Sequence, residues 1–202
     1  MIPNLEEIYS ILEKERVPHH IILHSEKVAI ISLFLGYFLR QKGIVLDLSL
    51  LIAGALLHDV KKYQTLIYGG NHAVEGYYFL KDLGYERIGK IVLYHIYYKP
   101  SHPLASITEE EIVYYADKRV KHEEIVSLKE RFKDLKIRYG QNFKAWIRMN
   151  HLEELTKLIE RRIFKRLPFG PEKVLELEKI KEVRDVFKRA SENSSFGWWN
   201  LL

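Results

Sequence analysis

Three short stretches of the sequence combine metal-binding side chains with otherwise apolar surroundings. His58 and Asp59 directly follow ten uncharged residues. Asp117 follows the apolar segment IVYYA, and His24 precedes the longest stretch that contains no acidic, basic or histidine residue. A buried carboxylate costs free energy unless it is paired or bound to a cation. In helical bundles, metal sites form where such side chains converge from separate helices. Together the four residues indicate a metal site, although each one alone has a structural explanation as a core histidine, a helix cap or an ion-pair partner.

The composition restricts the chemistry of such a site. The chain has 202 residues, nine histidines and no cysteine. The absence of thiols excludes a cysteine nucleophile, a thiolate zinc site and an iron–sulfur cluster. Any metal must therefore be held by nitrogen and oxygen atoms. Imidazole and carboxylate ligands are compatible with Mn, Fe, Co, Ni, Zn or Mg.

The elements that would position these residues are helices. Apolar residues recur at three- and four-residue intervals along almost the whole chain, and strictly alternating Val/Ile runs are missing, so we expect an all-α protein. All six prolines fall at breaks in this pattern. We expect helices at about 4–15, 19–42, 47–63, 71–83, 85–97, 108–121, 124–139, 142–166 and 171–191.

Capping residues support several of these boundaries. Asp47 and Asn71 are suitable N-caps for the helices that follow them. Thr108 and Glu111 have the spacing of a capping box, in which each side chain bonds the backbone of the other residue. These signals predict that His72 and the segment before Asp117 lie on helices.

The order of the motifs resembles the HD superfamily of metal-dependent phosphohydrolases. The segments are HSEKVA from His24, ALLHDVKK around His58 and Asp59, and YYADKRV around Asp117, and the resemblance spans about residues 19–122. It implies an HD-domain-like helical bundle, here with additional C-terminal helices, and it implies that these four residues are the ligands of one metal ion. We expect a metal-binding domain over residues 1–166. Residues 167–202 would then form a C-terminal helix and an aromatic tail that packs on the core or on a neighbouring subunit.

Two further histidines match positions that hold a second metal in dinuclear branches of the superfamily. They are His72 in NHAVEG and His95 in VLYHIYY. If both bind, the resemblance makes Asp59 the bridging carboxylate. The alternative is that His72 only occupies a first helical turn and that His95 packs among tyrosines. We expect one or two divalent transition metal ions, with Fe or Mn favoured by the resemblance if the site is dinuclear.

Two basic residues are candidates for contact with a substrate phosphate. Lys62 follows His58 by four residues, which places both side chains on one face if the helix continues. Arg119 is the weaker candidate, because a residue two positions after Asp117 points away from it on an ideal helix. We expect Asp59 and Lys62 to be catalytic.

The resemblance implies hydrolysis of a phosphoester or phosphoanhydride, with a nucleotide-like small molecule as the expected substrate and a metal-activated water as the attacking group. One alternative is an HD-type di-iron oxygenase, which would need all six ligands and would leave Lys62 unexplained. The other is a non-enzymatic nucleotide sensor or an RNA-binding helical protein. That alternative rests on the charge distribution, since residues 118–202 carry 21 Lys and Arg against 13 Asp and Glu.

The expected location is the cytoplasm, without a membrane partner. Val28–Leu39, the longest stretch without Asp, Glu, Lys, Arg or His, has twelve residues, fewer than the roughly 20 that cross a bilayer. The start of the chain carries Glu6 and Glu7 where a signal peptide needs basic residues. Nucleic acid is a possible partner but is not favoured, and the aromatic segment 196–202 makes a homo-oligomer possible.

Overall fold

Helices dominate the structure, as the periodicity predicts. The computed structural model describes residues 1–102, 104–180 and 186. In these residues the α-helices are α1 (Leu5–Lys14), α2 (His19–Gln41), α3 (Leu48–Leu57), α4 (Lys62–Tyr68), α5 (His72–Asp82), α6 (Glu86–Tyr94), α7 (Glu109–Asp117), α8 (Leu128–Tyr139) and α9 (Phe143–Phe164). A two-stranded antiparallel sheet, β1 (Val120–Lys121) and β2 (Glu124–Ile125), and a 3-10 helix, η1 (Pro171–Lys179), complete the described elements. The all-α fold class is confirmed.

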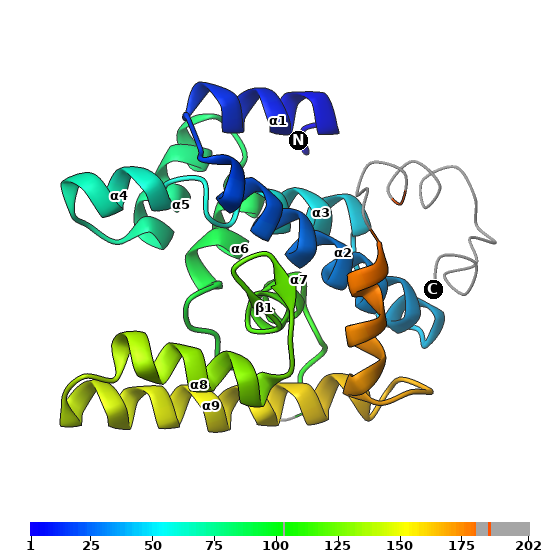
Figure 1. Cartoon of the computed structure of the whole chain (residues 1–202). Coiled ribbons are helices and arrows are strands. Elements are labelled where there is room, and N and C mark those ends of the chain that lie inside the picture. The colour runs from blue at the N-terminus through cyan, green and yellow to red at the C-terminus, as the bar shows by residue number, and fades with distance from the viewer. Residues whose placement is uncertain (103, 181–185, 187–202) are drawn as a thin grey trace.

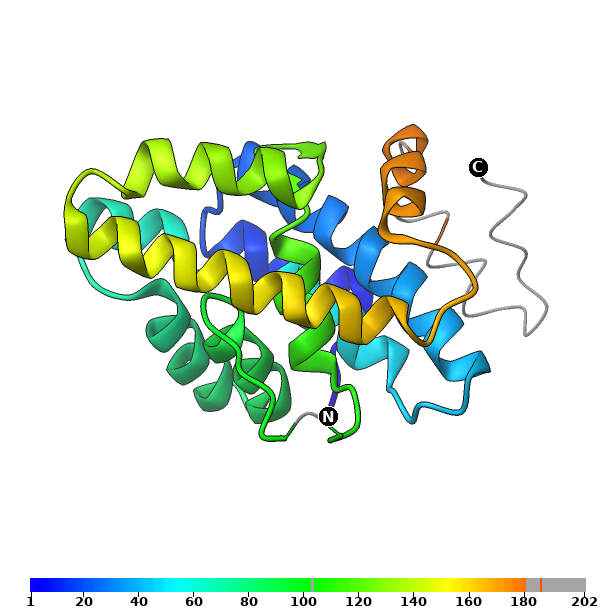
Figure 2. The same ribbon diagram turned by 90° about the horizontal axis from the view of Figure 1, so that it is seen from below.

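The core forms around α2 and α7. Helix α2 packs against α3 and α7, and α6 contacts α3, α5 and α7. Helices α8 and α9 lie side by side along one edge of the molecule, and α1 lies at the opposite edge (Figures 1 and 2). The helices that carry the candidate ligands therefore meet in the interior.

Helix α2 is long and apolar enough, by length and composition alone, to cross a membrane. Its most apolar 18-residue window has a mean hydropathy of 1.5. In the structure 72% of this window is buried by the rest of the protein. The burial is that of a core helix.

The predicted helix over 47–63 is wrong at its C-terminal end. Helix α3 ends at Leu57, residues 58–61 form a turn, and α4 starts at Lys62. The amide of Val60 bonds the carbonyl of Leu57, three residues back, which tightens the chain. The apolar periodicity continues through this turn because Val60 is buried as well, so the pattern does not reveal the break.

The predicted helices over 108–121 and 124–139 are also too long. Helix α7 ends at Asp117, and the chain turns through the hairpin of β1 and β2 before α8 begins. His122, in the hairpin turn, has a positive φ of 53°, which no residue inside an α-helix adopts. Ser127 then caps α8 by accepting a bond from the amide of Glu130. A hairpin with strands of two residues is too short to produce an alternation pattern.

The predicted N-caps are confirmed with one exception. The side chains of Asp47, Asn71 and Thr108 each accept a hydrogen bond from a backbone amide in the first turn of the following helix. The second half of the expected capping box at Thr108 is wrong, because the buried carboxylate of Glu111 accepts a bond from Arg162 on α9 instead. The predicted last helix, 171–191, is a 3-10 helix as far as Lys179, and the aromatic segment 196–202 lies outside the described residues.

Candidate metal centre

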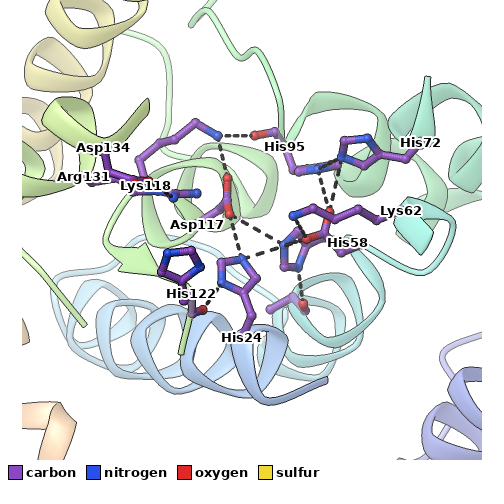
Figure 3. Close-up of polar contacts among 12 residues, drawn as sticks. His24, His58, Lys62, His72, His95, Asp117, Lys118, His122, Arg131 and Asp134 are labelled. Carbon is purple, nitrogen blue, oxygen red and sulfur yellow. Dashed lines mark hydrogen bonds and ion pairs between the residues drawn. The ribbon is translucent and has the colours of Figure 1, made fainter. Parts of the chain in front are cut away.

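Six predicted ligands from five parts of the chain meet at one point (Figure 3). Five of them stand at or just beyond a helix end, and only His24 lies well inside a helix, α2. The others are His58 and Asp59 in the turn after α3, His72 at the start of α5, His95 after the last residue of α6, and Asp117 at the end of α7. Five of the six residues are buried, and His72 is partly exposed.

Asp59 lies at the middle of this cluster and presents its two oxygens to different histidines. Oδ2 is 3.3 Å from Nε2 of His58 and 4.0 Å from Nε2 of His24. Oδ1 is 3.3 Å from Nε2 of His72 and 3.4 Å from Nε2 of His95. The carboxylate therefore divides the ligands into two groups that share it.

Asp117 completes the first of these groups. Its Oδ1 is 3.0 Å from Nε2 of His24 and 3.7 Å from Nε2 of His58. The first group thus consists of His24, His58, Asp59 and Asp117, and the second of His72, His95 and Asp59.

Backbone carbonyls fix the orientation of three imidazole rings. Nδ1 of His24 lies 2.7 Å from the carbonyl oxygen of His122 in the hairpin turn. Nδ1 of His58 lies 2.7 Å from the carbonyl of Ala55, and Nδ1 of His95 lies 2.5 Å from that of Val92. A carbonyl only accepts, so each Nδ1 carries a proton, and in the neutral form of each ring the lone pair of Nε2 points into the cluster. This is the arrangement of metal-binding histidines.

The buried polar atoms of the cluster fit a divalent cation. Nε2 of His58 and Oδ1 of Asp59 are buried and have no hydrogen-bond partner. Nε2 of His72 and Nε2 of His95 are 3.2 Å apart. Two such acceptors repel unless a cation or a proton lies between them, and an unsatisfied buried polar atom is costly. Nitrogen and oxygen donors of this kind suit divalent transition metals.

Neighbouring charges keep the carboxylates in the anionic form that binds a cation. Burial alone would raise the pKa of Asp59, but Lys62, whose Nζ is 2.6 Å from Oδ2, holds that pKa well below its usual range, with His58 contributing. Burial would likewise raise the pKa of Asp117, and Lys118 holds it well below its usual range. Burial lowers the pKa of His95 to about 4, so its ring is neutral near pH 7.

Lys118 is a further residue of the site, and none of the sequence motifs singled it out. Its buried Nζ is 2.5 Å from Oδ2 of Asp117 and donates to the carbonyl of His95 at 3.0 Å. Burial lowers the pKa of Lys118 against the attraction of Asp117, and the charge of Arg131 lowers it further. Lys118 thus joins the end of α7 to the end of α6. Its position directly after the predicted ligand Asp117 is the feature of the sequence that could have identified it.

The structure corrects the prediction for Arg119 as a phosphate contact. This residue is 2% exposed, and its guanidinium donates to the carbonyls of Val126 and Pro171 and to the hydroxyl of Tyr115. These bonds attach the hairpin and η1 to α7. Arg119 is therefore committed to the fold and cannot turn towards the cluster without breaking them.

Lys62 reaches the cluster for a different reason from the one expected. It does not share a helical face with His58, because the helix breaks between them, and it is the first residue of α4 instead. Its side chain is 34% exposed and lines a cavity of about 370 Å³ that opens on the cluster. The cavity is also lined by Asp59, His72, His95, Ile96, Tyr97, Asp117, Lys118, Arg131, Leu135, Tyr139, Arg148, Met149 and Leu152.

Comparison with known proteins agrees with this geometry. Residues 21–121 match the HD domain family, which is half of the chain and includes the six clustered residues. The chain belongs to the HD domain family. HD domain proteins are generally hydrolases that bind divalent metals, and the cluster centred on Asp59 is the part of this HD domain that could hold them.

A second comparison extends beyond the HD domain itself. The chain is 27% identical over 169 residues to an uncharacterized protein of Methanocaldococcus jannaschii, and the match covers 77% of this chain and 98% of that protein. No solved structure matches the chain. That relative carries no assigned activity.

Proposed function

We propose that this HD domain protein is a metal-dependent phosphohydrolase that cleaves a phosphoester or phosphoanhydride bond in a small, nucleotide-like molecule. The observation that carries the proposal is the position of Asp59, whose two oxygens face two separate sets of imidazole nitrogens beside an accessible cavity. Two metal ions that share a carboxylate are a common arrangement in enzymes that cleave phosphate esters.

The two groups of ligands described above would each hold one ion. Bound there, divalent ions would polarise the phosphoryl oxygens and lower the pKa of a coordinated water molecule towards neutrality. Fe and Mn are the favoured metals, and Co, Ni, Zn and Mg are compatible with the same donors.

Lys62 would contact the phosphoryl group that is cleaved. Burial would lower its pKa, but Asp59 raises the pKa above its ordinary value, so the ammonium group stays charged. Its partly exposed side chain faces the cavity, where it can bind a phosphoryl oxygen and stabilise the charge that develops during cleavage. Lys118 is buried behind Asp117 and acts as a positioning residue.

The size of the cavity supports a small molecule as the substrate. Ligand pockets of about 300–1,000 Å³ hold metabolite-sized compounds, and the 370 Å³ here is at the lower end of that range. We therefore propose a small phosphorylated partner rather than a nucleic acid. Separately, and from the sequence, we propose a cytoplasmic protein without a membrane partner.

The di-iron oxygenase remains a second candidate because the structure brings together all six ligands that it needs. Phosphate release under anaerobic conditions separates the two reactions. The purified protein should contain up to two metal ions per chain and release phosphate from p-nitrophenyl phosphate or from nucleotides without oxygen. A protein that binds metal but turns over only with oxygen would refute the phosphohydrolase, and strong salt-sensitive RNA binding without metal-dependent turnover would favour the non-enzymatic alternative.

A further inference from the structure

We propose that Arg131 and Arg148 form a second anion-binding subsite in the cavity, beside the metal centre, and that the substrate is consequently an organic diphosphate or longer polyphosphate. This inference rests on the proposed phosphohydrolase function. It goes further by assigning two residues to the recognition of a phosphate that is not the one cleaved.

Arg131 on α8 is a buried cation whose partners do not satisfy it. Its side chain is 9% exposed, and Nε is buried without a hydrogen-bond partner. The carboxylate nearest to it, Asp134, lies 3.3 Å from NH1 and is bound more closely by Arg138, one turn further along the helix. One carboxylate thus serves two guanidinium groups, and Arg131 keeps both a donor and positive charge for a further anion.

The position of Arg131 connects this charge to the candidate active site. Arg131 lies on the Lys118 and Asp117 side of the cluster, whereas Lys62 extends from α4 on the other side (Figure 3). Arg131 and Lys62 both line the 370 Å³ cavity. An anion that spans the cavity can therefore contact both of them.

The charges that line the cavity exceed the number its carboxylates can balance. Lys62 pairs with Asp59 at 2.6 Å, and Lys118 pairs with Asp117 at 2.5 Å. No remaining acidic residue lines the cavity among the residues that the structure describes, yet Arg131 and Arg148 do. Arg148 on α9 is exposed, and it forms no ion pair with any described residue. The metal ions and Lys62 suffice for one phosphoryl group, so the two arginines are available for another.

The type of residue and the remaining lining favour an organic phosphate. Planar guanidinium groups bind phosphate oxygens in pairs, which makes arginine well suited to phosphate recognition. The cavity wall next to the arginines is apolar and aromatic, with Leu135, Tyr139 and Met149 from α8 and α9. This wall can cover an apolar or planar group of the same molecule. Both helices lie beyond residues 21–121, so this subsite is built by helices outside the matched HD domain.

Binding measurements with compounds that cannot be hydrolysed test the subsite. The probes are methylenediphosphonate and methylphosphonate, which differ by one phosphonate group, titrated calorimetrically into the metal-loaded protein and its Arg131→Gln variant. A lost charge-assisted hydrogen bond should weaken binding of the diphosphonate about 10- to 100-fold. Binding of the monophosphonate should change less than about 3-fold, because it contacts only the metal side of the cavity. Metal content measured after each titration shows whether the diphosphonate has removed ions.

The matched control is Lys133→Gln, which removes an exposed cation on the same helix that does not line the cavity and should leave both affinities unchanged. Arg148→Gln changes an exposed side chain and keeps the test valid if Arg131→Gln does not fold. Equal weakening of both probes in Arg131→Gln, or an effect of the same size in Lys133→Gln, would overturn the subsite. Phosphate release by the wild-type protein is scored separately. Turnover without selective loss in Arg131→Gln removes only the subsite, whereas selective loss without turnover keeps the subsite and removes the hydrolase.

Discussion

Replacement of Asp59 by alanine is the most direct test of the metal centre. Its carboxylate is the group that both sets of imidazoles face, at 3.3 Å from Nε2 of His58 and 3.3 Å from Nε2 of His72. Asp59→Ala should therefore reduce the metal content from up to two ions per chain to none and abolish hydrolysis. The helical fold should survive, because Lys62, the cation that loses its partner, is 34% exposed and can turn to water.

The size of the effect on stability follows from linkage between metal binding and folding. A ligand present at 100 times its dissociation constant stabilises the folded state by about 2.7 kcal/mol. For a chain of about 200 residues, each kcal/mol changes the melting temperature by about 2–4 °C. Addition of metal to the metal-free wild-type protein should raise its melting temperature by about 5–11 °C under these conditions, and Asp59→Ala should lose this increase.

Elemental analysis and thermal melting with and without a chelator measure both quantities. Asp82→Ala, an exposed carboxylate at the end of α5, is the matched control and should behave as the wild type. His72→Ala should give an intermediate result, with one ion lost, because His72 contacts only the Oδ1 side of Asp59. Full metal content in Asp59→Ala would refute the assignment of the centre.

Three other substitutions distinguish residues that act in the reaction from residues that stabilise the fold. Lys62→Met should lower kcat/KM about 10- to 100-fold with unchanged metal content, because it removes a charge that faces the substrate; loss of metal by this variant would instead make Lys62 a positioning residue. Arg119→Met should lower the free energy of unfolding by about 2–4 kcal/mol in a denaturant titration, since it leaves buried partners unsatisfied, and an unchanged KM would support the purely structural role given above. Gly54→Ala should cost about 1–3 kcal/mol because a Cβ at this position would lie 2.7 Å from the side chain of Ile91 on α6. Ile91→Ala in the same chain should restore part of that loss, and an additive double variant would contradict the packing argument.

The sequence was informative where residue type and periodicity carry the information. Helix-forming periodicity predicted the fold class because each helix buries one apolar face in a common core. The candidate ligands were identifiable because His24, Asp59 and Asp117 are polar residues beside apolar segments, where water cannot solvate them. The structure brings these residues together with His58, His72 and His95, and their role as ligands stays a prediction until metal is measured.

The features that the sequence did not predict depend on contacts between residues far apart in the chain. The hairpin after Asp117 places the carbonyl of His122 against Nδ1 of His24, a contact between residues 98 positions apart in the chain. The cavity depends on how α8 and α9 pack beside the cluster. The segment around Arg131 has an ordinary amphipathic pattern, and this pattern does not indicate that Arg131 lines a cavity. Tertiary packing decides both features, and a single sequence does not encode it in its spacing.

The helix break at His58 explains why the wrong boundary and the right ligand belong together. In a continuing α-helix, the carbonyl of Ala55 would accept a bond from the amide of Asp59. The chain turns at that point, and the ring Nδ1 of His58 lies 2.7 Å from this carbonyl, which directs Nε2 into the cluster. The end of α6 repeats the arrangement, since His95 follows its last residue and places Nδ1 beside the carbonyl of Val92, also three residues back. Two helix ends therefore use carbonyls of the last turn to orient imidazoles. In a longer helix, as the periodicity predicted over 47–63, the amide of Asp59 would compete with the ring of His58 for the carbonyl of Ala55.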